Sequence, residues 1–158
     1  MKGDIAMKLA EALISRTDTQ KRMEQLKNRL LQNIKIQEGE SPNEDPGELQ
    51  KELTDLLSQL KQLIKRINRT NLQTDFDKHQ SLADALTERD LLGQERKIYS
   101  DMLEQASMRQ DRYSRSEIKF VTTINVKDTQ KYVDELSRKY RELDTRIQEL
   151  NWLTNLVD

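Results

Sequence analysis

Cysteine is absent from this chain of 158 residues, which excludes disulfides, thiolate metal sites and cysteine nucleophiles. A chain without cysteine fits a reducing compartment, so we predict a cytoplasmic location. Four glycines, two prolines and 4% aromatic residues leave room for few turns and favour a few long helices over many short strands. No apolar run approaches the roughly 18 residues of a membrane-spanning helix, so we predict no membrane association.

The charges nearly balance. Lysine and arginine number 27 against 28 aspartates and glutamates, for a net charge of -1, so any surface that attracts phosphates must be local. Asp4 and Glu11 stand where a signal peptide would carry its basic and apolar regions, so export by that route is not expected. The length predicts one domain over residues 1–158. Because only 34% of the residues are hydrophobic, we expect an elongated shape or a subunit that partners complete.

A heptad pattern between residues 49 and 67 is the strongest signal in the chain. Apolar residues recur there alternately four and three positions apart, at Leu49, Leu53, Leu56, Leu60, Leu63 and Ile67. Such a stripe buries itself against other helices, and Leu57 and Ile64 widen it as a bundle requires. The pattern predicts a mainly α fold of long antiparallel helices that form a bundle or coiled coil with a small β arm.

Periodicity and capping residues place four helices at about residues 4–36, 46–69, 81–108 and 128–156. Residues 37–47 are a predicted loop, since they hold two glycines and both prolines. Asp45 is a good N-cap before Pro46, and Asp128 is the predicted cap of the last helix. Near Arg89 and Gly93 the apolar face of the third helix is weakened.

Two segments, about 71–77 and 117–126, are predicted to be extended. Leu72, Thr74 and Phe76 alternate with polar residues in the first. In the second the apolar residues that share one side of an extended chain are Ile118, Phe120, Ile124 and Val126. Pairing of the two segments would satisfy their backbone groups, whether within one chain or between chains.

A basic cluster accompanies the second extended segment. Its members are Arg112, Tyr113, Arg115 and Lys119, and Phe120 follows directly. The cationic side chains could hold a phosphate chain while an aromatic ring stacks on a base. The alternative is a basic turn that pairs with acidic neighbours such as Asp111 and Glu117, and this alternative is favoured.

A compact polar motif follows the heptads, formed by Asn68, Arg69, Thr70 and Asn71. Its side chains could anchor an anion, so Asn68, Arg69 and Asn71 are candidate ligand-binding residues. The same residue types also cap helix ends and shape turns, and that interpretation is favoured.

Carboxylates are abundant, but no spacing predicts a catalytic or metal site. The sets Glu88, Asp90, Glu95 and Glu142, Asp144, Glu149 are candidate Mg²⁺ ligands only if they converge between facing helices. Most of them stand beside lysine or arginine, which favours a solvated face. His79 is the sole histidine, and Trp152 is a predicted packing anchor. We therefore predict no catalytic residue, no metal and no cofactor, and favour a protein that is not an enzyme.

Several segments in the same order carry a family resemblance. They are MKLAEALI from Met7, LKNRLLQNIKIQEGE, the Asp45-Pro46 helix start, IKRINRTN, LADALTERD, RYSRSEIKF and LDTRIQELNW. Together they resemble a bacterial family of unknown function that is often labelled septicolysin-like. The resemblance covers nearly the whole chain from Met7 onward and implies an α-helical protein, with no established activity to carry over. The label suggests a cytolysin, but the chain shows no long apolar hairpin that could enter a bilayer.

The leading hypothesis is a structural or interaction protein that self-associates through its heptad seams. A homo-oligomer with an even number of subunits is expected, because a two-fold axis is the commonest way for one exposed stripe to bury itself. The alternative is a module that binds nucleic acid or a phosphate ligand through residues 112–120. A divalent-metal hydrolase and a cytolysin rank behind both, and the sequence names no partner protein.

Overall fold

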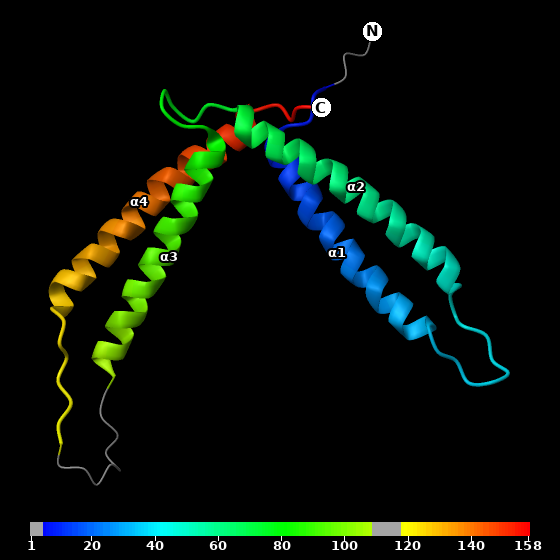
Figure 1. Cartoon of the computed structure of the whole chain (residues 1–158), viewed down its shortest axis with the longest axis horizontal. Helices are drawn as coiled ribbons and strands as arrows, with labels where there is room; N and C mark the ends of the chain where they lie inside the picture. The colour runs from blue at the N-terminus through cyan, green and yellow to red at the C-terminus, as the bar shows by residue number, and fades with distance from the viewer. Residues whose placement is uncertain (1–4, 109–117) are drawn as a thin grey trace. The chain divides into compact units, whose positions relative to one another are not determined.

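Four helices make up the regular structure of this computed structural model, which describes residues 5–108 and 118–158 (Figure 1). They are α1 (Leu9–Asn33), α2 (Pro46–Gln73), α3 (Leu82–Ser107) and α4 (Val126–Leu153). The prediction of a mainly α fold is confirmed. The helix α2 starts where its sequence indicates, because the Asp45 side chain accepts the Gly47 N–H (3.0 Å) and Pro46 occupies the first turn.

The predicted β arm is not found in residues 5–108 and 118–158. Residues 118–125 belong to no strand there, and the described pairing is limited to the isolated bridges Lys8–Asn155 and Asp75–Ser81. Alternation of apolar residues favours an extended chain but supplies no partner, and a strand forms only where a second one lies beside it.

The prediction that residues 71–77 are extended was wrong for residues 71–73, which are helical. Leu72 and Gln73 complete α2, and the helix ends when the Thr74 N–H bonds to the Thr70 carbonyl (3.0 Å). The start of α4 also differs from its predicted residue. Asn125, not Asp128, caps it, since the Asn125 Oδ1 atom accepts the Asp128 N–H (3.0 Å).

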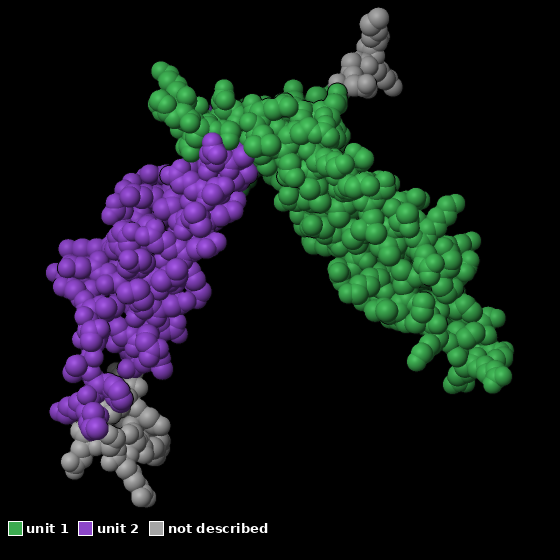
Figure 2. Space-filling model, in the orientation of Figure 1, with its two compact units in different colours: residues 1–82, 148–158 green, residues 83–147 purple. Residues whose placement is uncertain are grey.

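Contacts between residues divide the chain into two compact units (Figure 2). Unit 1 comprises Met1–Leu82 and Gln148–Asp158, and unit 2 comprises Ala83–Ile147. The single domain predicted from the length stays a prediction. In unit 1, α1 and α2 lie side by side, and Leu26 packs with Leu49 and Leu56. Leu56 is 4% exposed, whereas its neighbour Leu57 is 47% exposed and does not widen the buried stripe as predicted.

Polar contacts close the loop between α1 and α2. The buried side chain of Asn33 donates from Nδ2 to the Arg29 carbonyl (2.8 Å) and accepts the Glu44 N–H at Oδ1 (3.0 Å). The Arg29 guanidinium donates twice to the Glu44 carboxylate, once from Nε (3.1 Å) and once from Nη2, and these bonds lower the pKa of Glu44. The loop turns at Gly39, whose φ of 91° favours a residue without a Cβ atom.

Candidate functional site

Residues 154–158 form a short C-terminal segment that the rest of unit 1 holds. On one side the Leu9 N–H donates to the Thr154 carbonyl (2.9 Å), and the Leu156 N–H donates to the Met7 carbonyl (2.8 Å). The Lys8 Nζ atom donates to Asn155 Oδ1 (2.8 Å). These bonds tie the beginning of the described chain to its end, and the side chains of Leu9 and Leu156, whose N–H groups donate two of them, are buried.

The polar motif near the end of α2 holds the same segment from the other side. The Thr70 hydroxyl accepts the Val157 N–H (3.0 Å) and donates to the Arg66 carbonyl (2.8 Å). The Arg66 Nε atom donates to the Val157 carbonyl (2.9 Å), and Arg69 donates to the carbonyl of Asp158. Arg69, a candidate anion ligand, is therefore bonded to the chain's own backbone.

The other two candidates of this motif lie close by. Asn68 is exposed and Asn71 is half-buried, both within the last turns of α2. The structure thus brings Asn68, Arg69 and Asn71 together on one helix end, beside the C-terminal segment. Thr70, which the sequence placed in the motif but not among the candidate ligand-binding residues, is its fully buried member, and residue spacing does not show this.

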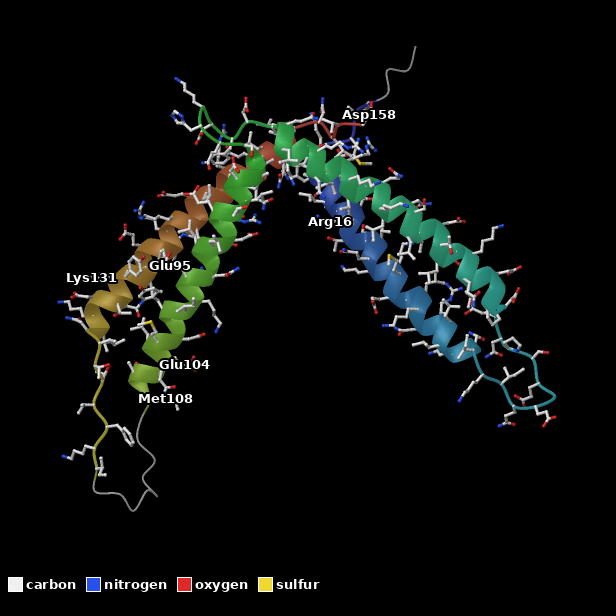
Figure 3. All side chains as sticks on the ribbon, in the orientation of Figure 1. Arg16, Glu95, Glu104, Met108, Lys131 and Asp158 are labelled. Carbon is white, nitrogen blue, oxygen red and sulfur yellow. The ribbon has the colours of Figure 1, made fainter. Side chains whose placement is uncertain are left out.

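In unit 2, polar side chains join α3 to α4. Arg89 Nη1 donates to Asp144 Oδ1 (3.0 Å), and Arg89 Nη2 lies 3.2 Å from the Asp90 carboxylate. The Tyr132 hydroxyl donates to the carboxylate of Glu95, which lies on α3 (Figure 3). This bond is the main cause that raises the pKa of Tyr132 to about 12. Two of the six candidate metal ligands, Glu95 and Asp144, thus make contacts between α3 and α4.

Aromatic rings fill the same seam. The Tyr99 and Tyr132 rings pack edge to face, with centroids 4.8 Å apart and an interplanar angle of 77°. The Arg96 guanidinium carbon lies 5.2 Å from the centroid of the Tyr140 ring. A Cβ atom on Gly93 would lie 3.2 Å from that same ring, so the glycine makes room for it. Pairs with low residue numbers in α3 have high numbers in α4, so the two helices run antiparallel.

These contacts explain what sequence reasoning missed. The apolar face of α3 weakens near Arg89 and Gly93, and those positions are where Asp144 and Tyr140 of α4 fit. A polar or small residue within an apolar stripe is therefore a usable signal for a cross-helix partner, although the partner itself cannot be read from the spacing.

The segment of residues 118–126 leads into α4, and its first residues are exposed to solvent. Exposed fractions are 71% for Ile118, 83% for Phe120 and 82% for Val121. Lys119 is exposed as well. The remaining members of the predicted basic cluster, Arg112, Tyr113 and Arg115, lie outside the described residues, so their arrangement with Lys119 stays a prediction.

No group of three or more metal-ligating side chains gathers within residues 5–108 and 118–158. His79 belongs to a turn in which its N–H donates to Asp77 Oδ1 (2.7 Å), and the Gln80 N–H donates to the same atom (3.0 Å). The bond from His79 is the main cause that lowers the pKa of Asp77. Trp152, the predicted packing anchor, is exposed instead.

Comparison with known proteins gives a family. The family of unknown function DUF6847 matches residues 16–156. The chain belongs to this family. A crystal structure of a functionally unknown conserved protein from Corynebacterium diphtheriae is 47% identical, with 96% of this chain and 99% of that chain covered and a TM-score of 0.91. No curated protein matches the chain.

Membership in DUF6847 leaves the septicolysin-like label untested, because neither match mentions it. The cytolysin that the label suggests therefore stays a hypothesis. Among the helices of the described chain, none combines the length and the apolar character needed to span a membrane.

Proposed function

We propose that the protein is a helical interaction protein that self-associates into a homo-oligomer with an even number of subunits. The observation that carries the proposal is a stripe of exposed apolar side chains on α3. Leu91 is 56% exposed, Ile98 is 59% exposed and Met102 is 37% exposed. Spacings of seven and four residues put the three side chains on one side of the helix, where they form a continuous surface. We call this surface the α3 stripe.

The heptad stripe of α2 faces α1 of the same chain. Four of the six heptad residues of α2, Leu49, Leu56, Leu60 and Ile67, are buried within unit 1, where Leu49 and Leu56 pack against Leu26 of α1. A seam that one chain has already filled offers nothing to a second copy. The α3 stripe is a different surface, because the seam of α3 with α4 uses other residues, such as Gly93 and Tyr99.

Few apolar side chains are buried within the described part of unit 2, so burial of further apolar surface would stabilise it. Its buried apolar side chains in the described residues are Ala85, Val133, Leu136 and Ile147. Two antiparallel helices cover only one stripe of each other, and a stable domain usually adds a further layer. Full removal of a leucine, isoleucine or methionine side chain from water contributes about 1.5 to 3 kcal/mol, so a two-fold interface that buries two copies of the α3 stripe would supply that layer.

A charged double variant tests this proposal. Leu91→Glu with Ile98→Glu places like charges at any interface formed by the α3 stripe, so the oligomer should dissociate in analytical ultracentrifugation. The helical circular dichroism signal should persist, because both side chains are exposed within the chain. Gln59→Glu with Gln62→Glu is the matched control, since it adds the same charge at two exposed polar positions of α2, away from the α3 stripe. Equal masses for the two double variants would contradict the α3 stripe as the interface.

A second candidate function is nucleic-acid or phosphate binding by residues 112–120. The observation that favours it is the exposed pair Lys119 and Phe120, a cation beside an aromatic ring. Binding of single-stranded nucleic acid should then weaken steeply with salt and be lost in an Arg112→Ala, Arg115→Ala variant. Absence of binding in low salt would remove this candidate.

A further inference from the structure

The exposed side of α2 carries three cations in one row. Lys61, Lys65 and Arg69 follow one another at intervals of four residues, so they lie on the same side of the helix, and all three are exposed. Each interval advances about 6 Å along the helix axis, so the row extends for about 12 Å. The buried side chains of Leu60 and Ile67 lie on the other side of the helix. We call the three cations the α2 basic row.

Carboxylates do not balance the α2 basic row. From residue 56 to residue 74 the sequence contains no aspartate or glutamate. In the described part of the chain, neither Lys61 nor Lys65 forms an ion pair. Arg69 donates to the Asp158 carbonyl, which uses one of its five N–H donors. The Asp158 carboxylate lies 3.7 Å from Nη2 of Arg66, which is not part of the row.

Two common reasons for cations on a helix do not account for the α2 basic row. Cations in the last turn of a helix stabilise it through the macrodipole, but the last turn of α2 contains no basic residue. Lys61 lies about 18 Å from the last helical residue, Gln73, and the effect falls off within one turn. Other exposed cations pair with a carboxylate four residues away, as Lys97 does with Asp101 (2.6 Å). The α2 basic row has no such carboxylate, so its charge is available to a ligand.

The side chains around the α2 basic row match the phosphate backbone of a nucleic-acid duplex. Ser58, Gln62 and Asn68 adjoin the row and are exposed, and side chains of these kinds bond to phosphate oxygens in protein–DNA complexes. The helix contains no aromatic residue, so the row offers no ring on which an unpaired base could stack. A duplex keeps its bases inside and presents its phosphates, and it is therefore the form of nucleic acid that the row fits.

A protein or a membrane fits the α2 basic row less well. Protein interfaces are depleted of lysine and enriched in aromatic side chains, whereas this row has two lysines and no ring. A helix that binds a bilayer needs an exposed apolar face, but α2 buries its apolar face within unit 1. The exposed leucines beside the row, Leu57 and Leu72, stand about 22 Å apart along the axis and form no continuous patch.

We propose that the α2 basic row binds the phosphate backbone of double-stranded nucleic acid without selecting a base sequence. This inference goes beyond self-association and does not rest on it, because the α2 basic row and the α3 stripe lie on different helices. Three phosphate contacts should give a plot of log binding constant against log salt concentration with a slope of about −2.7 for each chain bound. Binding of this kind is weak at physiological salt, with a Kd of about 10⁻⁴ to 10⁻⁶ M, so a duplex should not stay bound on a sizing column.

Fluorescence anisotropy of the full chain with short labelled DNA and RNA duplexes tests this site. Lys61→Gln with Lys65→Gln should lower the affinity in low salt at least about tenfold and reduce the salt slope by about 2, because two phosphate contacts are lost. Lys127→Gln with Lys131→Gln is the matched control, since it removes the same charge from two exposed lysines four residues apart on α4. Both variants should keep the helical circular dichroism signal of the parent chain.

A loss of affinity confined to the variant of Lys61 and Lys65 would support the proposal. Equal losses in the two variants would overturn it, because net charge alone would then hold the duplex. A loss confined to the control variant would overturn it in favour of a site near residues 112–126. Absence of binding to both duplexes in low salt would also overturn it, as would tighter binding of polyglutamate or of phosphatidylserine vesicles. Light scattering of the parent chain reports self-association separately, so either proposal can fail alone.

Discussion

The Thr70 hydroxyl accepts the backbone N–H of Val157 at 3.0 Å, which joins two residues that lie 87 positions apart in the sequence. The same oxygen donates to the Arg66 carbonyl at 2.8 Å, and the threonine side chain is fully buried. A hydroxyl that both donates and accepts in a buried position uses both of its hydrogen-bonding roles. The end of α2 therefore binds the chain's own C-terminal segment through hydrogen bonds.

Thr70→Val should destabilise the protein by about 1 to 3 kcal/mol, because the replacement keeps the shape of the side chain and leaves the Val157 N–H without its acceptor. Urea denaturation followed by circular dichroism measures the loss. Thr54→Val is the control, since exposed Thr54 makes the same bond to the carbonyl four residues earlier (3.0 Å) but holds no distant segment. Equal losses in the two variants would mean that the C-terminal segment adds nothing to the stability of unit 1.

Two adjacent leucines of α2 test the buried stripe. Leu56→Ala should lower the free energy of unfolding by about 2 to 5 kcal/mol, because it leaves a cavity against Leu26. Leu57→Ala should change it by no more than about 0.5 kcal/mol, since that side chain is 47% exposed. The two variants remove the same atoms one residue apart in one helix. A larger effect at Leu57 would show that the stripe faces the other way.

The helices of this fold were predictable because their signals are local. The heptad spacing in α2 and the Asp45-Pro46 helix start follow from periods and caps within a few residues. The contact of Thr70 with Val157 has no such signal, since nothing in the spacing links residues so far apart. The alternation of apolar residues in 117–126 indicated an extended chain, but a strand also needs a second strand beside it, and the described residues 118–125 belong to no strand.

Alkaline pH should weaken the contact of Tyr132 with Glu95. Folding raises the pKa of Tyr132 from 10.0 to about 12, so the folded chain retains a proton that the unfolded chain loses in this range. The contribution to stability is complete below pH 10 and disappears as the pH rises toward 12. The difference in unfolding free energy between the parent chain and Tyr132→Phe, measured on both sides of pH 10, should shrink with rising pH. A constant difference would show that the hydroxyl is not held by Glu95.

The ion pair between Arg89 and Asp144 should be worth more than the exposed pairs on α4, because the Arg89 side chain is mostly buried. A double-mutant cycle with Arg89→Met and Asp144→Asn should give a coupling of about 1 to 2 kcal/mol. The matched cycle at exposed Arg138 and Glu142 should give less than about 0.5 kcal/mol. Equal couplings would contradict the role of Arg89 in joining α3 to α4.

Self-association is the central claim, and the solution mass of the full chain tests it most directly. Light scattering behind a sizing column should give an even multiple of the chain mass. The ratio of absorbance at 260 and 280 nm on the same peak should be that of protein alone. A peak that carries nucleic acid would favour the second candidate function. A mass of one chain that does not change with concentration would contradict the account.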